Sequence, residues 1–258
     1  MIRKILFVCF LIAVMILAGC GGSTTTETKK EELKQPTAAP AVAPEPGGAA
    51  IEGKVAFVGA KPARTPVSMD ATPQCSRQHS SPPLSEVAIV NDNGTLKNVF
   101  VYVKAGLPNQ TWPAPKGPVT IDQSGCMYKP HVTGVMVGQN VEFLNNDPTN
   151  HNVHPLPMVN REWNQSQAPK GDPIIRTFDK EEIMVPIKCN LHPWMRVYVG
   201  VVSHPFFAVS GDDGAFAIKG LPAGEYTLEA WHERFPKQEL KVKVDAAGVA
   251  KAEFTFKG

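Results

Sequence analysis

The sequence has almost no excess of charge of either sign. Its 258 residues include 26 basic and 24 acidic side chains. No Asp or Glu precedes Glu27, and Arg3 and Lys4 are the only basic residues before position 20, so both surplus charges lie in the leading segment. The rest of the chain is balanced and lacks the net positive charge on which nucleic-acid binding depends. We therefore exclude nucleic acid as a partner.

The chain also lacks an apolar run long enough to cross a bilayer comfortably, which takes about 20 residues. The run from Ile5 to Ala18 is shorter and follows a basic pair, as in a secretion signal. Its ending, Leu17-Ala18-Gly19-Cys20, resembles the lipobox of bacterial lipoproteins. That resemblance implies a signal peptide at 1–19, a lipidated Cys20 and a place in the cell envelope, at the outer membrane facing the periplasm or the exterior. A plain signal peptide or an uncleaved anchor is the alternative.

Residues 20–50 have few large apolar side chains and carry four prolines among alanines. Such a segment cannot bury enough apolar surface to fold. We expect a lipidated, disordered tether whose ends lie ~30 Å apart.

Beyond residue 50 the sequence shows neither a long helix nor a regular repeat. Short apolar or alternating segments are separated by glycine and proline, and the chain holds 21 and 24 of these residues. This pattern predicts an all-β fold of sandwich type. The segments expected to be strands are 51–58, 87–90, 99–103, 119–121, 135–144, 196–202, 214–218, 226–231, 240–244 and 252–256.

Cysteine is scarce, with five in the chain. Cys9 leaves with the signal and Cys20 carries the lipid, so Cys75, Cys126 and Cys189 remain in an oxidising compartment. Because three is odd, either one thiol has a separate role or all three are unpaired.

One short stretch combines three metal-binding side chains: Cys189-Asn-Leu-His192-Pro-Trp-Met195. Thiolate and thioether suit Cu(I), and imidazole suits Cu(II), so this mixture is typical of a copper ion that changes oxidation state. A trigonal copper site needs a second imidazole. His151 and His154 are the candidates, because both follow the predicted strand 135–144.

Residues 119–203 resemble the cupredoxins, and among them the amicyanin-like blue copper domains. The motifs are Val137-Gly-Gln-Asn-Val-Glu-Phe143, the His-Asn-Val-His run and the short Cys-x-x-His-Pro-x-Met-Arg loop. The resemblance implies one type 1 copper ion held by His151, Cys189, His192 and Met195. His154 is then left beside the ligands, with a supporting or docking role.

The same resemblance assigns roles to neighbours of the ligands. Asn152 would brace one ligand loop against the other. Leu191 stands where the family has proline, and its N–H can reach the Cys189 sulfur. The edge of His192, in an apolar patch with Trp194, would be the port through which electrons pass.

Other interpretations of the cluster remain. Zinc is the nearest rival metal, although thioether is a poor zinc ligand, and a metal-free site is the other alternative. A binuclear copper centre is excluded because the loop has no second cysteine. If Cys189 binds copper, Cys75 and Cys126 are left as a disulfide pair, with two separate buried thiols as the alternative.

The C-terminal part carries a second resemblance. Asp213-Gly-Ala-Phe and Leu221-Pro-Ala-Gly-Glu-Tyr resemble carboxypeptidase regulatory-like, transthyretin-type sandwiches. Three regions follow: 51–117, an N-terminal β region that can be the first half of that sandwich; 118–204, the copper domain; and 205–258, the transthyretin-like region. The combination is similar to proteins labelled methylamine-utilisation proteins.

We therefore expect a membrane-tethered blue copper protein that carries single electrons between redox partner proteins. The alternative is copper delivery or storage with the same residues. No nucleophile–base pair is evident, and Met195 would fill the axial copper position, so we do not expect an enzyme.

Overall fold

The computed structural model describes residues 48–258. The signal peptide, Cys20 and nearly all of the tether lie outside this part, although Ala49 and Ala50, assigned to the tether, belong to the first strand. The described chain contains one short helix, α1 (Pro73–Ser76), and sixteen strands, so the predicted all-β fold is confirmed. No helix in residues 48–258 is long and apolar enough to span a membrane.

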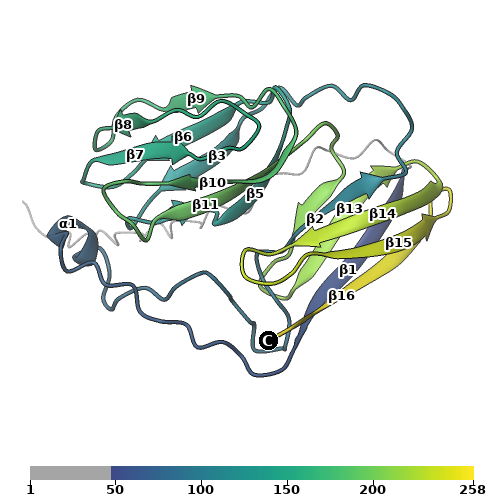
Figure 1. Cartoon of the computed structure of the whole chain (residues 1–258), viewed down its shortest axis with the longest axis horizontal. Coiled ribbons are helices and arrows are strands. Elements are labelled where there is room, and N and C mark those ends of the chain that lie inside the picture. Colours follow the sequence, from purple (N-terminus) through teal and green to yellow (C-terminus); the bar gives the residue numbers. More distant parts are fainter. Residues whose placement is uncertain (1–47) are drawn as a thin grey trace, which may run out of the picture. The chain divides into compact units, whose positions relative to one another are not determined.

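One sandwich is built from the middle of the chain (Figure 1). Its first sheet has the order β4-β3-β6-β9, and its second has the order β5-β11-β10-β7-β8. Alternate side chains of both sheets, such as Ile121, Phe143 and Val199, meet in one buried core. The strands are β3 (Val119–Gln123), β4 (Tyr128–Lys129), β5 (Val132–Met136), β6 (Val141–Asn145), β7 (His151–Pro155), β8 (Gln165–Gln167), β9 (Ile174–Arg176), β10 (Glu182–Lys188) and β11 (Arg196–Val202).

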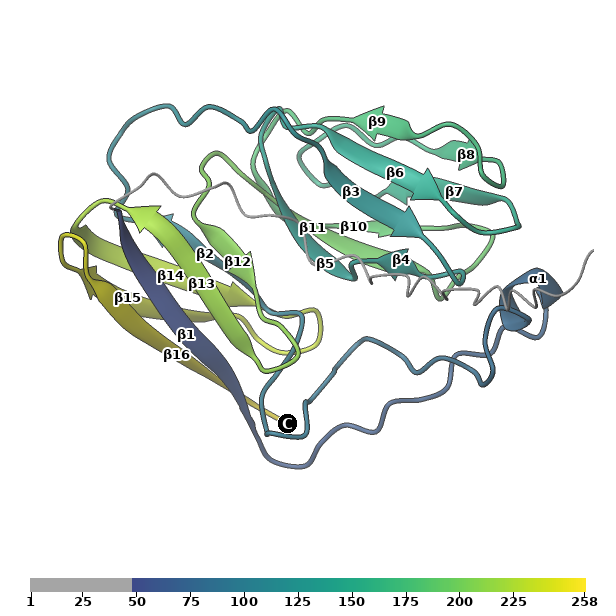
Figure 2. The same ribbon diagram turned by 180° about the vertical axis from the view of Figure 1, so that it is seen from behind.

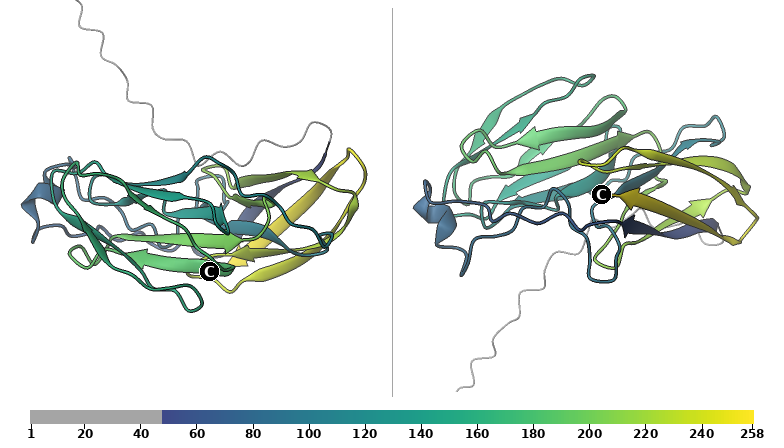
Figure 3. Two further views of the ribbon diagram at one scale, coloured as in Figure 1. Left: turned by 90° about the horizontal axis from the view of Figure 1, so that it is seen from above. Right: turned by 60° about the horizontal axis from the view of Figure 1, so that its bottom comes forward.

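A second sandwich combines strands from before and after the first (Figure 2). Its sheets have the orders β13-β1-β16 and β12-β2-β14-β15, with a shared core that includes Ile51, Val101 and Phe254. Strands β1 and β16 pair in parallel although some 200 positions separate them, for example Glu52 with Lys251 (Figure 3). The strands are β1 (Ala49–Val58), β2 (Phe100–Ala105), β12 (Phe207–Val209), β13 (Ala215–Leu221), β14 (Gly224–Trp231), β15 (Gln238–Val244) and β16 (Val249–Lys257).

Two expected strands differ in the structure. The segment 135–144 is not one strand, because a turn at Gly138, whose φ is +77°, sends its halves into opposite sheets as β5 and β6. Residues 87–90 do not form a strand and make only an isolated bridge, between Val90 and Leu96. A turn follows at residues 91–94, in which Gly94 has a φ of +77°.

Between β1 and β2 the chain makes a long excursion that we call the capping loop, residues 61–86. Its two arms run side by side, with hydrogen bonds from Val67 N to Pro83 O and from Ser85 N to Thr65 O, both 2.8 Å. Helix α1 lies at its tip. Met69 and Cys75 of this loop are buried in the core of the first sandwich, which fixes the tip against that domain.

Candidate metal centre

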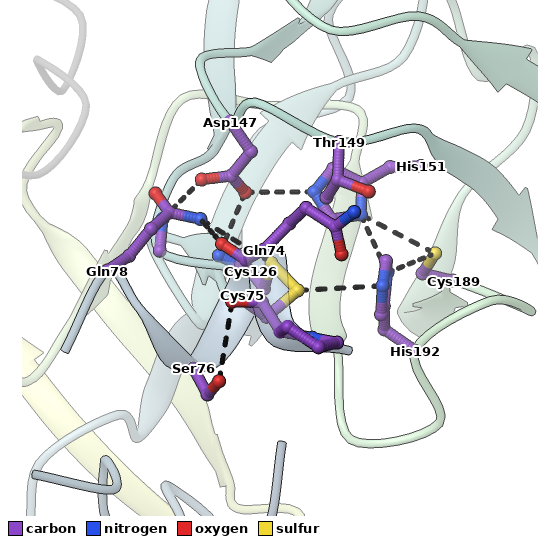
Figure 4. The surroundings of a disulfide bond; sticks show 12 residues. Gln74, Cys75, Ser76, Gln78, Cys126, Asp147, Thr149, His151, Cys189 and His192 are labelled. Carbon is purple, nitrogen blue, oxygen red and sulfur yellow. Dashed lines mark hydrogen bonds and ion pairs between the residues drawn. A yellow bond between two sulfur atoms is a disulfide. The ribbon is translucent and has the colours of Figure 1, made fainter. Parts of the chain in front are cut away.

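Three nitrogen and sulfur atoms converge at one end of the first sandwich. His151 begins β7, and Cys189 and His192 lie in the loop between β10 and β11. The Cys189 sulfur is 3.8 Å from Nδ1 of His151 and 3.6 Å from Nδ1 of His192, and the two Nδ1 atoms are 2.9 Å apart (Figure 4). All three side chains are buried. This spacing allows one ion to contact all three atoms.

The surroundings of Cys189 favour its thiolate. Burial raises the pKa of the thiol, but hydrogen bonds from the two imidazoles and two backbone N–H groups lower it more, to about 6. Those N–H groups belong to Asn152, 3.5 Å from the sulfur, and to Leu191. Leu191 stands where the cupredoxin-like loop has proline, which has no backbone N–H, and its contact with the sulfur is the one that this difference implies. Because the thiolate is the metal-binding form, the site is prepared for a soft ion.

Met195 closes the same loop. Its side chain is fully buried in the core that contains Cys189. Its N–H donates to His192 O at 2.9 Å, and its carbonyl accepts from Cys189 N at 3.3 Å. These bonds fold Cys189–Met195 into a compact loop. The axial role of the Met195 sulfur stays a prediction.

The side chain of Asn152 joins the two loops that carry the cluster. Its Oδ1 accepts a hydrogen bond from Asn190 N at 2.7 Å and lies 3.4 Å from the Cys189 sulfur. Its Nδ2 donates to Asn164 Oδ1 at 2.7 Å. This is the bracing contact that the cupredoxin resemblance implies.

His154 lies outside the cluster. Strand alternation places its ring near the surface, where Nδ1 is 3.0 Å from Asn190 Oδ1 and Nε2 is 2.7 Å from Glu162 Oε1. The structure thus brings His151, and not His154, to Cys189 and His192. Through Asn190, His154 still contacts the loop that carries Cys189.

Asp147 is a component that the sequence analysis missed. Its fully buried carboxylate accepts from His151 Nε2 at 2.8 Å and from the N–H groups of Gly125 and Cys126 at 2.6 and 2.8 Å. Burial raises its pKa, but these bonds and the nearby imidazole lower it more. For His151, burial lowers the pKa, while Asp147 and Cys189 raise it by a larger amount. The sequence signal that could have identified Asp147 is its position four residues before the candidate ligand His151.

The disulfide between Cys75 and Cys126 is present, with Cα atoms 5.5 Å apart, and Cys189 is free. It joins α1 of the capping loop to the segment between β3 and β4. Figure 4 shows it directly beside the cluster, where the Cys75 sulfur is 3.5 Å from Nε2 of His192.

This arrangement corrects the expected electron port. The His192 side chain is 3% exposed, because the disulfide and α1 cover the ring edge that we expected to reach solvent. Trp194 is half-buried, with its Nε1 donating to Cys126 O at 2.9 Å and its ring 5.2 Å from that of His192. Leu191 and Pro193 are the exposed apolar residues of the loop.

The residues present fit a copper ion. One thiolate and two imidazoles converge, and a buried thioether lies in the same loop. Among the contacts of residues 48–258, no carboxylate touches the three converging atoms. Soft sulfur with imidazole is the donor set of copper sites that change oxidation state. The Asp147–His151 bond resembles the carboxylate–histidine pairs that orient metal ligands.

Comparisons with known proteins give a mixed result. No protein-family model matches the chain, and no curated protein matches it. Structural neighbours include the copper-containing nitrite reductase from Thermus scotoductus SA-01, with 21% identity over 38% of this chain and 25% of that chain, at a TM-score of 0.31. A purple cupredoxin from Nitrosopumilus maritimus has 22% identity over 32% of this chain and 97% of its own, at a TM-score of 0.28. A mutant amicyanin in its Cu(I) form has 20% identity over 39% of this chain and 97% of its own, at a TM-score of 0.30.

The structural similarity to these three proteins is weak, with TM-scores between 0.28 and 0.31. The transthyretin-like resemblance of the second sandwich and the lipoprotein character of the N-terminus stay predictions.

Proposed function

We propose that this protein holds one copper ion at His151, Cys189, His192 and Met195 and carries single electrons between redox partners. The observation that carries the proposal is the convergence of the Cys189 sulfur and two Nδ1 atoms within 3.8 Å of one another. The ion supplies the one-electron chemistry by cycling between Cu(II) and Cu(I).

The chain's own contacts favour rapid electron transfer because they hold the ligands still. Asn152 ties the two ligand loops together, and Asp147 fixes the ring of His151. Ligands that keep their positions in both oxidation states need little rearrangement when an electron arrives. The buried donors also exclude solvent from the site.

Copper delivery or storage is the alternative, and one observation weighs against it. A delivery site releases its ion to a partner, whereas His192 is covered by a disulfide-anchored loop. We therefore propose retention of the ion. The Cys189 thiolate and the His151 imidazole, which could otherwise act as a nucleophile and a base, are both assigned to the ion, so we propose no catalytic reaction.

The experiment is copper loading of the full-length chain. Cu(II) should produce intense visible absorption from charge transfer with the Cys189 thiolate, and a reductant followed by an oxidant should remove and restore the colour without loss of copper. Cys189→Ser is the control and should remain colourless. Preferential uptake of zinc, or loss of copper in each cycle to a chelator, would count against an electron carrier.

We further propose that a lipid at Cys20 anchors the protein to the bacterial cell envelope. The support is the lipobox-like ending of the apolar run and the proline-rich segment that follows it. Such a tether lets the folded part reach partners while it stays attached.

A further inference from the structure

The two imidazoles of the cluster differ in what their outer nitrogens contact. Nε2 of His151 bonds to the Asp147 carboxylate, as is usual for a histidine that binds a metal through its other nitrogen. Nε2 of His192 has no oxygen partner among the contacts of residues 48–258 and faces the Cys75 sulfur at 3.5 Å. The His192 side chain is 3% exposed, so this nitrogen is a buried polar atom aimed at a disulfide.

That nitrogen belongs to a second cluster of potential ligands. The sulfur atoms of Cys75 and Cys126 and a nitrogen of His192 all lie within 4.8 Å of one another, and the three residues are buried. The amide of Gln78 also reaches the Cys126 sulfur, at 3.7 Å. The disulfide occupies the two sulfur atoms, and its reduction would free them.

We propose that reduction of the Cys75–Cys126 disulfide creates a second site for a soft monovalent metal ion such as Cu(I), bound by both thiolates and Nε2 of His192. A dithiol reductant supplies two electrons and two protons to the S–S bond and becomes a disulfide. Two thiols form, and Cu(I) binding then releases their two protons. Two thiolates and one imidazole suit Cu(I), which prefers soft sulfur and a low coordination number.

The proposal shares His192 with the proposed copper site, but it does not depend on the electron-carrier function. If both ions were bound, His192 would have to contact them as an imidazolate, Nδ1 toward Cys189 and Nε2 toward Cys75, so binding of the second ion would release the ring N–H proton as well as the two thiol protons. With Cys189 removed, the second site keeps all of its ligands. The Cys189→Ser variant therefore tests the second site by itself.

The test counts Cu(I) ions per chain before and after reduction. The full-length protein is reduced without oxygen, by refolding from denaturant with reductant if the native disulfide resists, and the reductant is then removed. Thiol titration defines the starting state. Among the residues that follow Cys20, the reduced wild type should show three free thiols and reduced Cys189→Ser should show two. Cu(I) is then titrated against a chromogenic Cu(I) chelator.

We expect the wild type to bind one Cu(I) when oxidised and two when reduced. Cys189→Ser should bind none when oxidised and one when reduced, with two sulfur and one nitrogen neighbour in X-ray absorption. Cys75→Ser/Cys126→Ser should bind one in either state. Adding His192→Gln to reduced Cys189→Ser should weaken Cu(I) binding by at least about tenfold.

Failure has a distinct pattern. A reduced wild type with three titrated thiols and one Cu(I), or a reduced Cys189→Ser that binds none, would overturn the second site. An unchanged affinity on adding His192→Gln would overturn the ligand role of Nε2. If oxidised wild type binds no copper while reduced Cys189→Ser binds one, the electron-carrier function fails and the second site stands.

Discussion

The His-Asn-Val-His run places two imidazoles in very different positions. His151 is buried against Cys189, while His154 lies near the surface between Asn190 and Glu162. His151→Ala should abolish the visible absorption of the copper-loaded protein, because one of three converging donors is lost. His154→Ala is the matched control and should change the absorption only slightly. The opposite result would show that the ligand has been assigned to the wrong histidine.

Asp147 acts on the site through His151. Its carboxylate holds Nε2 of the ring at 2.8 Å, which increases the donor strength of Nδ1. Asp147→Asn should lower Cu(II) affinity by about 10- to 100-fold and raise the reduction potential, since Cu(II) gains most from a strong donor. Asp122→Asn is a suitable control, because this carboxylate bonds to Asn146 at the surface. Equal affinities and potentials for the two variants would contradict a positioning role.

At the scale of elements, the disulfide ties the capping loop to the first sandwich across 51 positions of sequence. Closing such a loop stabilises the folded state by about 4 kcal/mol in the chain-entropy model. Cys75→Ser/Cys126→Ser should therefore lower the free energy of unfolding by about 2–5 kcal/mol, measured by denaturant titration. The variant should still take up Cu(II) and turn coloured. Loss of copper binding in a folded variant would show that the disulfide is needed to hold the ligands.

The elements also show what the sequence could and could not predict. Strands with clear alternation, such as β13 to β16, lie close to their expected positions. Strand β10 was missed because Pro186 and its mixed composition conceal the pattern. The ligand cluster could be predicted because Cys189, His192 and Met195 are near one another in sequence. The covering of His192 could not, since Cys75 lies 117 positions away and burial there depends on tertiary folding.

At the scale of the whole molecule, His131 connects three segments. Its Nε2 is 2.5 Å from Glu233 Oε1, and its Nδ1 is 3.2 Å from Arg196 O and 3.7 Å from Glu86 Oε2, with the Tyr198 ring against its edge. Burial lowers the pKa of His131, but the bond to Glu233 and the charges of both glutamates raise it above 6.5 overall.

The folded state holds the imidazolium proton of His131 more tightly than the unfolded state does. The stabilisation that protonated His131 gives to the folded state is therefore fully present below pH 6.5 and is lost as pH rises through the folded-state pKa. The difference in unfolding free energy between the wild type and His131→Gln should therefore shrink as pH rises, measured by denaturant titration at several pH values. Glu233→Gln should flatten the pH dependence. A difference that grows with pH would mean that His131 is neutral in the folded protein.

The proposed attachment to a membrane also concerns the whole molecule, although Cys20 lies outside the described residues. Cys20→Ala should leave an unlipidated precursor, because the proposed lipid would be attached to the cysteine at the end of the lipobox-like sequence. Phase separation in detergent should then recover the variant in the aqueous phase and the wild type in the detergent phase. Identical partitioning would contradict a lipid anchor.

The parallel pairing of β1 with β16 has a consequence for the order of events during synthesis. Within residues 48–258, the strands that pair with β1 are β13 and β16, both made at least about 150 residues later than β1, although Ala56 also forms an isolated bridge with Thr95. The strands of the first sandwich, in contrast, are complete once residue 202 has emerged. The first sandwich, which contains the ligand cluster, can therefore assemble while β1 still lacks both of its partner strands, and the second sandwich forms last. A chain halted before β16 would present its ligand cluster intact beside an open β1 edge, which is a surface for association with other chains.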